Sequence, residues 1–233
     1  MVGIFLNAAS VIGPAHIKAS LPNQDAVIVR SKKGYWLAVV CDGMGSRRHS
    51  DVGSQCATKS VFHAVNKHSF GVNDRELVET IYLTWLSELK KKSIKPAEAV
   101  TTCLFAWGQC DGRFRFAHLG DGMIASASNV LSVGKDSHFG SETTGLGLST
   151  RLSDWSFGKG LLSEHGDCLA LMTDGISEDL SEPTKFCVEL NVELTKRSFR
   201  LGKRWLQNQL RNWPTKGHSD DKTLALIRKK DVD

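Results

Sequence analysis

The chain has 233 residues, of which 41% are apolar and 24% are charged, and its formal net charge is +5. These values fit one globular domain over residues 1–233 and argue against a disordered chain. The mild positive charge favours phosphorylated or acidic partners without requiring nucleic acid. No apolar run approaches the ~20 residues of a membrane-spanning helix, and the first residues lack the basic flank of a signal peptide. We therefore expect a soluble, cytoplasmic monomer that contacts neither membrane nor nucleic acid.

The cysteines and histidines argue against two other classes of protein. None of the six cysteines forms a Cys-x-x-Cys motif, and most lie inside apolar runs. Buried free thiols are therefore a better interpretation than a disulfide framework. The eight histidines are scattered along the chain with no His-x-x-x-His pair, so a zinc site has little support.

The first half of the chain predicts two strands, two helices and then further strands. Residues 27–30 and 35–41 have the apolar character of paired strands. Helical spacing follows over 50–68 and again over 73–92, where Asn73 and Glu76 form a capping-box-like start. Strand patterns return over three ranges: 99–109, 113–119 and 123–133.

The second half predicts one long loop, two strands and two helices. Residues 137–160 are rich in Gly, Ser and Thr, which indicates a loop. The remaining elements are a strand over 167–173, helices over 183–196 and 199–213, and a strand over 223–228. The basic and aromatic residues of 196–211 could indicate nucleic acid, but a helix with one buried stripe and a solvated basic face explains them better. Strand hairpins with helix pairs between them predict an α+β fold in layers.

Five short acidic motifs place an aspartate where a strand gives way to a loop, and three of them put glycine directly after it. The motifs are Asn-Gln-Asp (23–25), Cys-Asp-Gly-Met-Gly (41–45), Gly-Asp-Gly (120–122), Thr-Asp-Gly (173–175) and Ser-Asp-Asp-Lys-Thr (219–223). A single Asp-Gly is a common turn. Five in this order indicate an oxygen-only site for hard divalent cations.

Carboxylates on strand ends bind Mg²⁺ or Mn²⁺ and leave coordination positions open for phosphate oxygens. Two such ions ~3.5–4 Å apart can bridge a water, lower its pKa and clamp an in-line attack at phosphorus. Asp42, Asp174 and Asp220 can supply the carboxylates, and Gly43 can supply a backbone carbonyl because it has no side chain. We therefore predict Asp42, Asp174 and Asp220 as the residues on which catalysis depends.

In the order and context of these motifs, the chain resembles the metal-dependent protein serine/threonine phosphatases of type 2C, in their compact bacterial branch, from residue 13 to residue 227. The resemblance implies a central β-sandwich of two mainly antiparallel sheets flanked by helix pairs, a four-layer αββα fold. It also implies two or three Mn²⁺ or Mg²⁺ ions at one end of the sandwich. A metal-bridging hydroxide would attack phosphoserine or phosphothreonine in a protein directly, and a cognate Ser/Thr kinase would be the usual partner in signalling.

By this resemblance, Asp42 looks like the carboxylate that bridges two metals, with the Gly43 carbonyl on the second. Asp174 and Asp220 resemble the other ligands of the first metal, and Asp25 matches the acidic residue near the second. By the same resemblance, Asp121 matches the ligand of a third metal. Asp221 falls where the family usually has Asn, which implies that it does not bind a metal directly. We favour Asp220 over Asp221 as the ligand.

Three departures from the family bear on phosphate binding and proton transfer. Gln24 stands where many members have Glu, and Ser20 stands where many carry an Arg that holds the substrate phosphate. His16 and Lys18 lie close in sequence and are candidates to replace that Arg, although neither has its two-pronged geometry. A second candidate pair, Arg47 and its neighbour Arg48, follows the Asp-Gly-Met-Gly turn.

The general acid and the exact activity stay open at this stage. Met44 occupies the place of the general-acid histidine that some members have, which leaves metal-bound water, His16 or His49 for that role. The loop over 137–160 falls where the family carries a variable flap beside the active site. Two alternatives to a protein phosphatase are a phosphatase-like module that binds with little turnover and a metal-dependent hydrolase of a small phosphoester.

Overall fold

The computed structural model describes residues 2–32, 34–134, 144–164, 166–215 and 219–231. Its helices are α1 (Pro14–Ala19), α2 (Ser50–Lys67), α3 (Asp74–Lys91), α4 (Asp174–Ser177), α5 (Pro183–Thr195) and α6 (Phe199–Arg211), with 3₁₀ turns at Pro96–Glu98 and Leu152–Asp154. Its strands are β1 (Val2–Val11), β2 (Asp25–Lys32), β3 (Tyr35–Asp42), β4 (Cys103–Gln109), β5 (Arg113–Leu119), β6 (Met123–Ser126), β7 (Val130–Val133), β8 (Ser156–Leu161), β9 (Cys168–Met172) and β10 (Lys222–Asp231).

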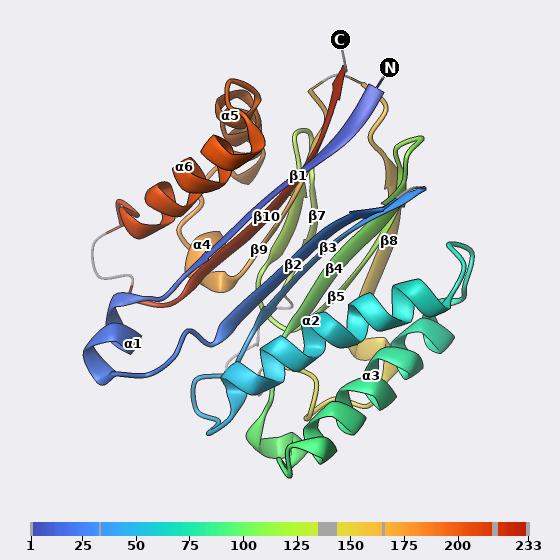
Figure 1. Cartoon of the computed structure of the whole chain (residues 1–233), viewed down its shortest axis with the longest axis vertical. Helices are drawn as coiled ribbons and strands as arrows, with labels where there is room; N and C mark the ends of the chain where they lie inside the picture. The colour runs from blue at the N-terminus through green and yellow to red at the C-terminus, as the bar shows by residue number, and fades with distance from the viewer. Residues whose placement is uncertain (1, 33, 135–143, 165, 216–218, 232–233) are drawn as a thin grey trace.

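The strands form two antiparallel five-stranded sheets in the orders β1-β10-β9-β6-β7 and β2-β3-β4-β5-β8. The sheets face each other, with α5 and α6 outside the first sheet and α2 and α3 outside the second (Figure 1). This confirms the predicted α+β fold with four αββα layers.

Strand alternation explains why three separate cores form. Along β3, Leu37, Val39 and Cys41 pack against α2 and α3, because successive side chains of a strand point to opposite faces. The alternate residues Trp36, Ala38 and Val40 pack between the two sheets. A third core joins the first sheet to α5 and α6. Both faces of each sheet are therefore covered, which explains the continuous apolar run of β3.

Local signals in the sequence define several of these elements. The side chain of Asn73 caps α3 by accepting a hydrogen bond from the N–H of Glu76 at 2.9 Å, which confirms the predicted start of that helix. The β4–β5 hairpin turns at Gly112, whose φ of +96° is a conformation that favours glycine. All six cysteines are free, and five of them are buried.

The structure corrects three predicted elements and adds others that the sequence analysis did not predict. The strand expected over 123–133 is two strands, β6 and β7, with a register shift between them. The strand expected from residue 99 begins at Cys103. In the loop expected over 137–160, residues 137–143 lie outside the described residues, but β8 occupies its last part. Strand β1 and helix α1 were not predicted at all.

Within the described ranges, no helix has both the length and the hydropathy needed to cross a membrane.

Candidate functional site

Asp42 lies at the end of β3, where the strand leaves the sheet and a pair of threonines fixes its backbone. The Asp42 N–H donates to Thr102 Oγ1 at 2.9 Å. The Asp42 carbonyl accepts from Thr101 Oγ1 and from the Thr102 N–H, each at 2.8 Å. Because these bonds occupy only backbone groups of Asp42, its carboxylate is left to face the pocket described below.

Asp25 lies beside Asp42 at the start of β2, since the two residues are register partners across the β2–β3 pair. One carboxylate oxygen of Asp25 accepts a 3.0 Å hydrogen bond from Thr173 Oγ1. The other, Oδ1, is buried and has no hydrogen-bond partner within the described ranges. An orphaned carboxylate oxygen of this kind needs a cation or water to satisfy it.

Asp174 follows β9 and begins α4, and the glycine after it allows two chain segments to approach closely. A Cβ on Gly175 would lie 1.9 Å from the backbone oxygen of Asp221. Likewise, a Cβ on Gly43 would lie 2.5 Å from the Ser50 carbonyl oxygen. The Asp-Gly pairs are therefore required by packing at the site, in addition to any turn that they form.

One pocket of about 260 Å³ collects five of the six predicted metal-binding residues. Its lining includes Asp42, Gly43, Asp121, Asp174 and Asp220, which come from four separate segments of the chain. The sixth predicted residue, Asp25, does not line the pocket and is buried beside Asp42. His16, Gln24, Thr101, Thr102 and Thr144 also belong to the lining.

The carboxylates of the site destabilise one another in the absence of a cation. Burial raises the pKa of Asp42 well above its usual range, and the charges of Asp25, Asp174 and Asp220 raise it further. Burial, with the repulsion of Asp221 added, also raises the pKa of Asp25 to about 7. The pKa of Asp174 is raised by burial and by the charge of Asp220. Bound cations would relieve this repulsion.

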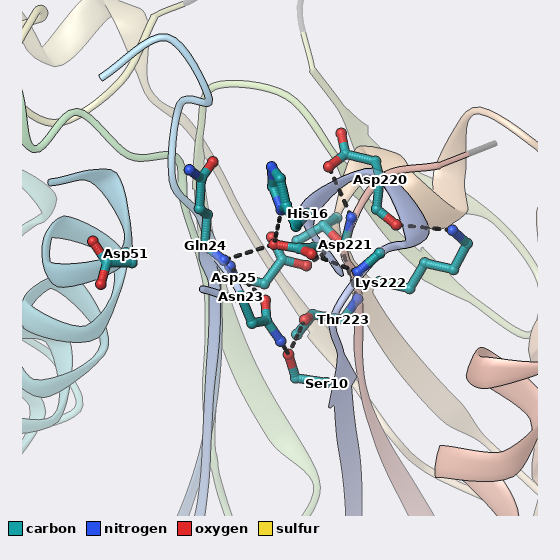
Figure 2. Close-up of polar contacts among 12 residues, drawn as sticks. Ser10, His16, Asn23, Gln24, Asp25, Asp51, Asp220, Asp221, Lys222 and Thr223 are labelled. Atoms are coloured by element: carbon teal, nitrogen blue, oxygen red, sulfur yellow. Dashed lines mark hydrogen bonds and ion pairs between the residues drawn. The ribbon is translucent and has the colours of Figure 1, made fainter. Parts of the chain in front are cut away.

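The adjacent aspartates before β10 have different surroundings. Asp220 is exposed and lines the pocket. Asp221 is buried and accepts 2.6 Å hydrogen bonds from the N–H groups of Gly13 and Gln24. Its Oδ2 also lies 2.9 Å from Nδ1 of His16. Figure 2 shows His16 above the Asp221 carboxylate, between Gln24 and Asp220.

The predicted phosphate-binding residues lie at different distances from the pocket. His16 lines it, whereas Lys18 on the same helix is exposed and does not. Arg47 folds back on Met44, a lining residue, with Nε 3.4 Å from Sδ. The roles of Thr101, Thr102 and Thr173 were missed. Thr101 and Thr102 fell inside the strand predicted over 99–109, although the observed strand β4 begins only after them. The one signal for Thr173 was its place directly before an Asp-Gly.

An acidic pocket at one end of an αββα sandwich is the combination that the resemblance implied. A model of the protein phosphatase 2C family matches residues 12–213, so the chain belongs to the protein phosphatase 2C family. Among curated protein sequences, none matches the chain.

Solved structures share the fold at low sequence identity. One is the catalytic domain of the serine/threonine protein phosphatase PstP in complex with two manganese ions, at 15% identity and a TM-score of 0.68 over 99% of this chain and 100% of that one. Another is PppA of Pseudomonas aeruginosa, a regulatory component of the type VI secretion system, at 16% identity and 0.71 over 98% and 100%. RsbX in complex with magnesium matches at 12% identity and 0.64 over 98% and 96%.

Proposed function

We propose that this protein is a Mn²⁺- or Mg²⁺-dependent phosphatase that hydrolyses phosphoserine and phosphothreonine in proteins. The observation that carries the proposal is the gathering of Asp42, Asp121, Asp174 and Asp220 in one pocket. Family membership supports a phosphatase, and the manganese and magnesium in two structural neighbours support the choice of ions.

The donor set fits hard divalent cations. It consists of carboxylate oxygens and the Gly43 carbonyl, and it includes the orphaned Oδ1 of Asp25 beside Asp42. Asp42 would bridge two ions, Gly43 would bind the second, and Asp174 and Asp220 would complete the first. Asp25 would serve the second ion, with Asp121 available for a third. When bound, the ions supply an activated water and neutralise charge on the phosphoryl group.

Side chains around the pocket would hold the phosphate. His16 lines the same pocket as the carboxylates and is the first candidate for a contact to a phosphate oxygen. Arg47 is the second, because its Nε lies 3.4 Å from Sδ of Met44, which lines the pocket. Lys18 is exposed on α1 and does not line the pocket, so it is the weakest of the three candidates for a contact to the phosphate.

The test measures hydrolysis of an aryl phosphate and of a phosphothreonine peptide with Mn²⁺, with Mg²⁺ and with chelator. We expect metal-dependent turnover of both, and a loss of about 100-fold or more in Asp42→Asn and in Asp174→Asn, because each removes a ligand charge. Glu79→Gln, an exposed change on α3, is the matched control and should keep full activity. Near-full turnover in both aspartate variants would contradict the site. Metal binding without turnover would indicate a binding module, and turnover of the aryl phosphate alone would indicate a small-phosphoester hydrolase.

A further inference from the structure

Asp220 and Asp221 are neighbours in sequence with opposite environments. Asp220 is exposed at the pocket, whereas Asp221 is only 2% exposed. One oxygen of Asp221 accepts the Gly13 N–H and the other accepts the Gln24 N–H, each at 2.6 Å. Such bonds to a carboxylate are stronger than those between neutral groups. The Asp221 carboxylate therefore already has partners from within the chain.

A metal bound by Asp221 would compete with these hydrogen bonds. One ligand atom each of His16, Asp220 and Asp221 lies within 4.8 Å of the other two, a spacing that a metal could bridge. Coordination through either Asp221 oxygen would weaken a bond to a buried backbone N–H, and an unpaired buried N–H is costly. The contacts of Asp221 therefore favour a structural role over a ligand role.

Helix α1 depends on this segment for its position. It has six residues, none of them buried, so little apolar packing holds it. Its start is tied to the Asp220 segment by two bonds, from the Gly13 N–H to Asp221 and from the Ala15 N–H to the Ser219 carbonyl at 3.0 Å. A Cβ on Gly13 would lie 2.3 Å from the Asp220 carbonyl carbon, so the approach requires glycine.

The ring of His16 continues this connection into the pocket. Nδ1 of His16 is buried and lies 2.9 Å from Asp221 Oδ2, so the ring stands directly against that carboxylate. The ring stands between Gln24 and Asp220 with its second nitrogen pointing away from Asp221 (Figure 2). His16 lines the pocket, so that second nitrogen is the one available to a ligand.

We propose that Asp221 is a positioning residue that holds helix α1 and the His16 ring over the pocket, and that it is not a metal ligand. This inference rests on the proposed function, because it takes a phosphoryl oxygen as the group that His16 contacts. Asp221 then acts on phosphate affinity through His16, whereas its neighbour Asp220 acts on metal affinity.

The test compares Asp221→Asn with Asp220→Asn in the full chain. Calorimetry measures the affinity for Mn²⁺. Steady-state kinetics with a phosphothreonine peptide give KM and kcat, and competitive inhibition by inorganic phosphate gives the affinity for phosphate. Asp221→Asn keeps one acceptor oxygen and replaces the other by an NH₂ group, which cannot accept a hydrogen bond from the N–H of Gly13 or Gln24. We expect KM and the phosphate inhibition constant to rise roughly 10-fold or more in Asp221→Asn, with Mn²⁺ affinity within about 3-fold of wild type. Asp220→Asn should weaken Mn²⁺ binding by more than about 10-fold.

A double-mutant cycle separates positioning from general destabilisation. His16→Gln alone should raise KM as Asp221→Asn does, and adding Asp221→Asn to it should change KM little further, because the two residues act as a unit. Additive losses, or Mn²⁺ binding weakened in Asp221→Asn as much as in Asp220→Asn, would overturn the proposal.

The proposal stays testable if Asp221→Asn fails to fold and also if the wild-type protein shows no turnover. If Asp221→Asn does not fold, the kinetics of His16→Gln test the proposal. An unchanged KM and an unchanged phosphate inhibition constant in His16→Gln would overturn it, because His16 would then not contact the phosphate that Asp221 is proposed to position it for. If the wild-type protein binds Mn²⁺ but turns over no substrate, the proposed function fails. The Mn²⁺ titrations and the binding of inorganic phosphate to the Mn²⁺-loaded variants then decide the role of Asp221 by themselves.

Discussion

At Asp25, a buried carboxyl contributes, with Asp42 and Asp174, to the pH dependence of the stability of the metal-free protein. Burial raises the pKa of Asp25 from 3.8 to about 7. Between these values the folded state binds more protons than the unfolded state, so the free energy of unfolding falls as pH rises from about 4 to about 7. Urea unfolding of the metal-free protein at pH 5 and pH 8 measures this loss, which should be smaller in Asp25→Asn. Equal losses in the two proteins would contradict it.

At the same scale, the sequence predicted the acidic residues and not the groups that orient them. Asp42, Asp174 and Asp220 stand in motifs whose local form indicates metal chemistry. Thr173 and Asp221 stand in the same motifs, but the motifs do not show which groups these two residues contact, because their partners lie far away in sequence. Thr173 donates to Asp25, 148 residues away, and Asp221 accepts from Gly13, 208 residues away. Only the folded chain brings these groups together.

At the scale of elements, the glycines of α2 and the loop after it should respond differently to alanine. A Cβ on Gly53 in α2 would lie 1.9 Å from the Ala99 carbonyl oxygen, and backbone would have to move. We expect Gly53→Ala to lower the free energy of unfolding by about 1–3 kcal/mol, although alanine normally stabilises a helix relative to glycine.

Gly71→Ala is the matched control for Gly53→Ala. A Cβ on Gly71 has no heavy atom within 4 Å, so its free energy of unfolding should change by less than about 0.5 kcal/mol. Urea unfolding curves of both variants check the pair. A Gly53→Ala protein as stable as wild type would show that α2 can shift away from residue 99 at little cost.

The elements that sequence patterns missed are those defined by distant partners. Strand β1 contains Asn, Ala and Ser in its middle and is a strand because it pairs with β10 along its whole length. Strand β8 contains Gly158 and Gly160, which indicate a loop in isolation. In the fold, the rings of Phe116 and Phe114 cover those glycines, with aromatic atoms 2.2 Å and 2.5 Å from where a Cβ would lie. Helices α2 and α3 were predictable because their apolar spacing is local.

For the whole molecule, metal binding should be visible as stability. The predicted ligands come from segments at residues 25, 42, 121, 174 and 220, so ions bound among them would hold both sheets in place. At 100 times its dissociation constant, Mn²⁺ should add ~2.7 kcal/mol and raise Tm by roughly 5–10 °C. Thermal unfolding with Mn²⁺ and with chelator measures the shift, which Asp42→Asn should largely remove. An equal shift in Asp42→Asn would place the stabilising ion elsewhere.

The pairing of β1 with β10 has a consequence for synthesis of the protein. The two strands pair from Val2↔Asp231 to Val11↔Lys222, so the first sheet closes only when residues from both ends of the sequence are available. The segment that leads into β10 also carries Asp220 and Asp221. A nascent chain on the ribosome therefore lacks both its sheet closure and part of its acidic pocket until residues 219–231 have emerged. Contacts so distant in sequence are expected to form late and slowly. Strand β10 therefore completes the first sheet, and the segment leading into it completes the acidic pocket, only after translation has passed residue 231.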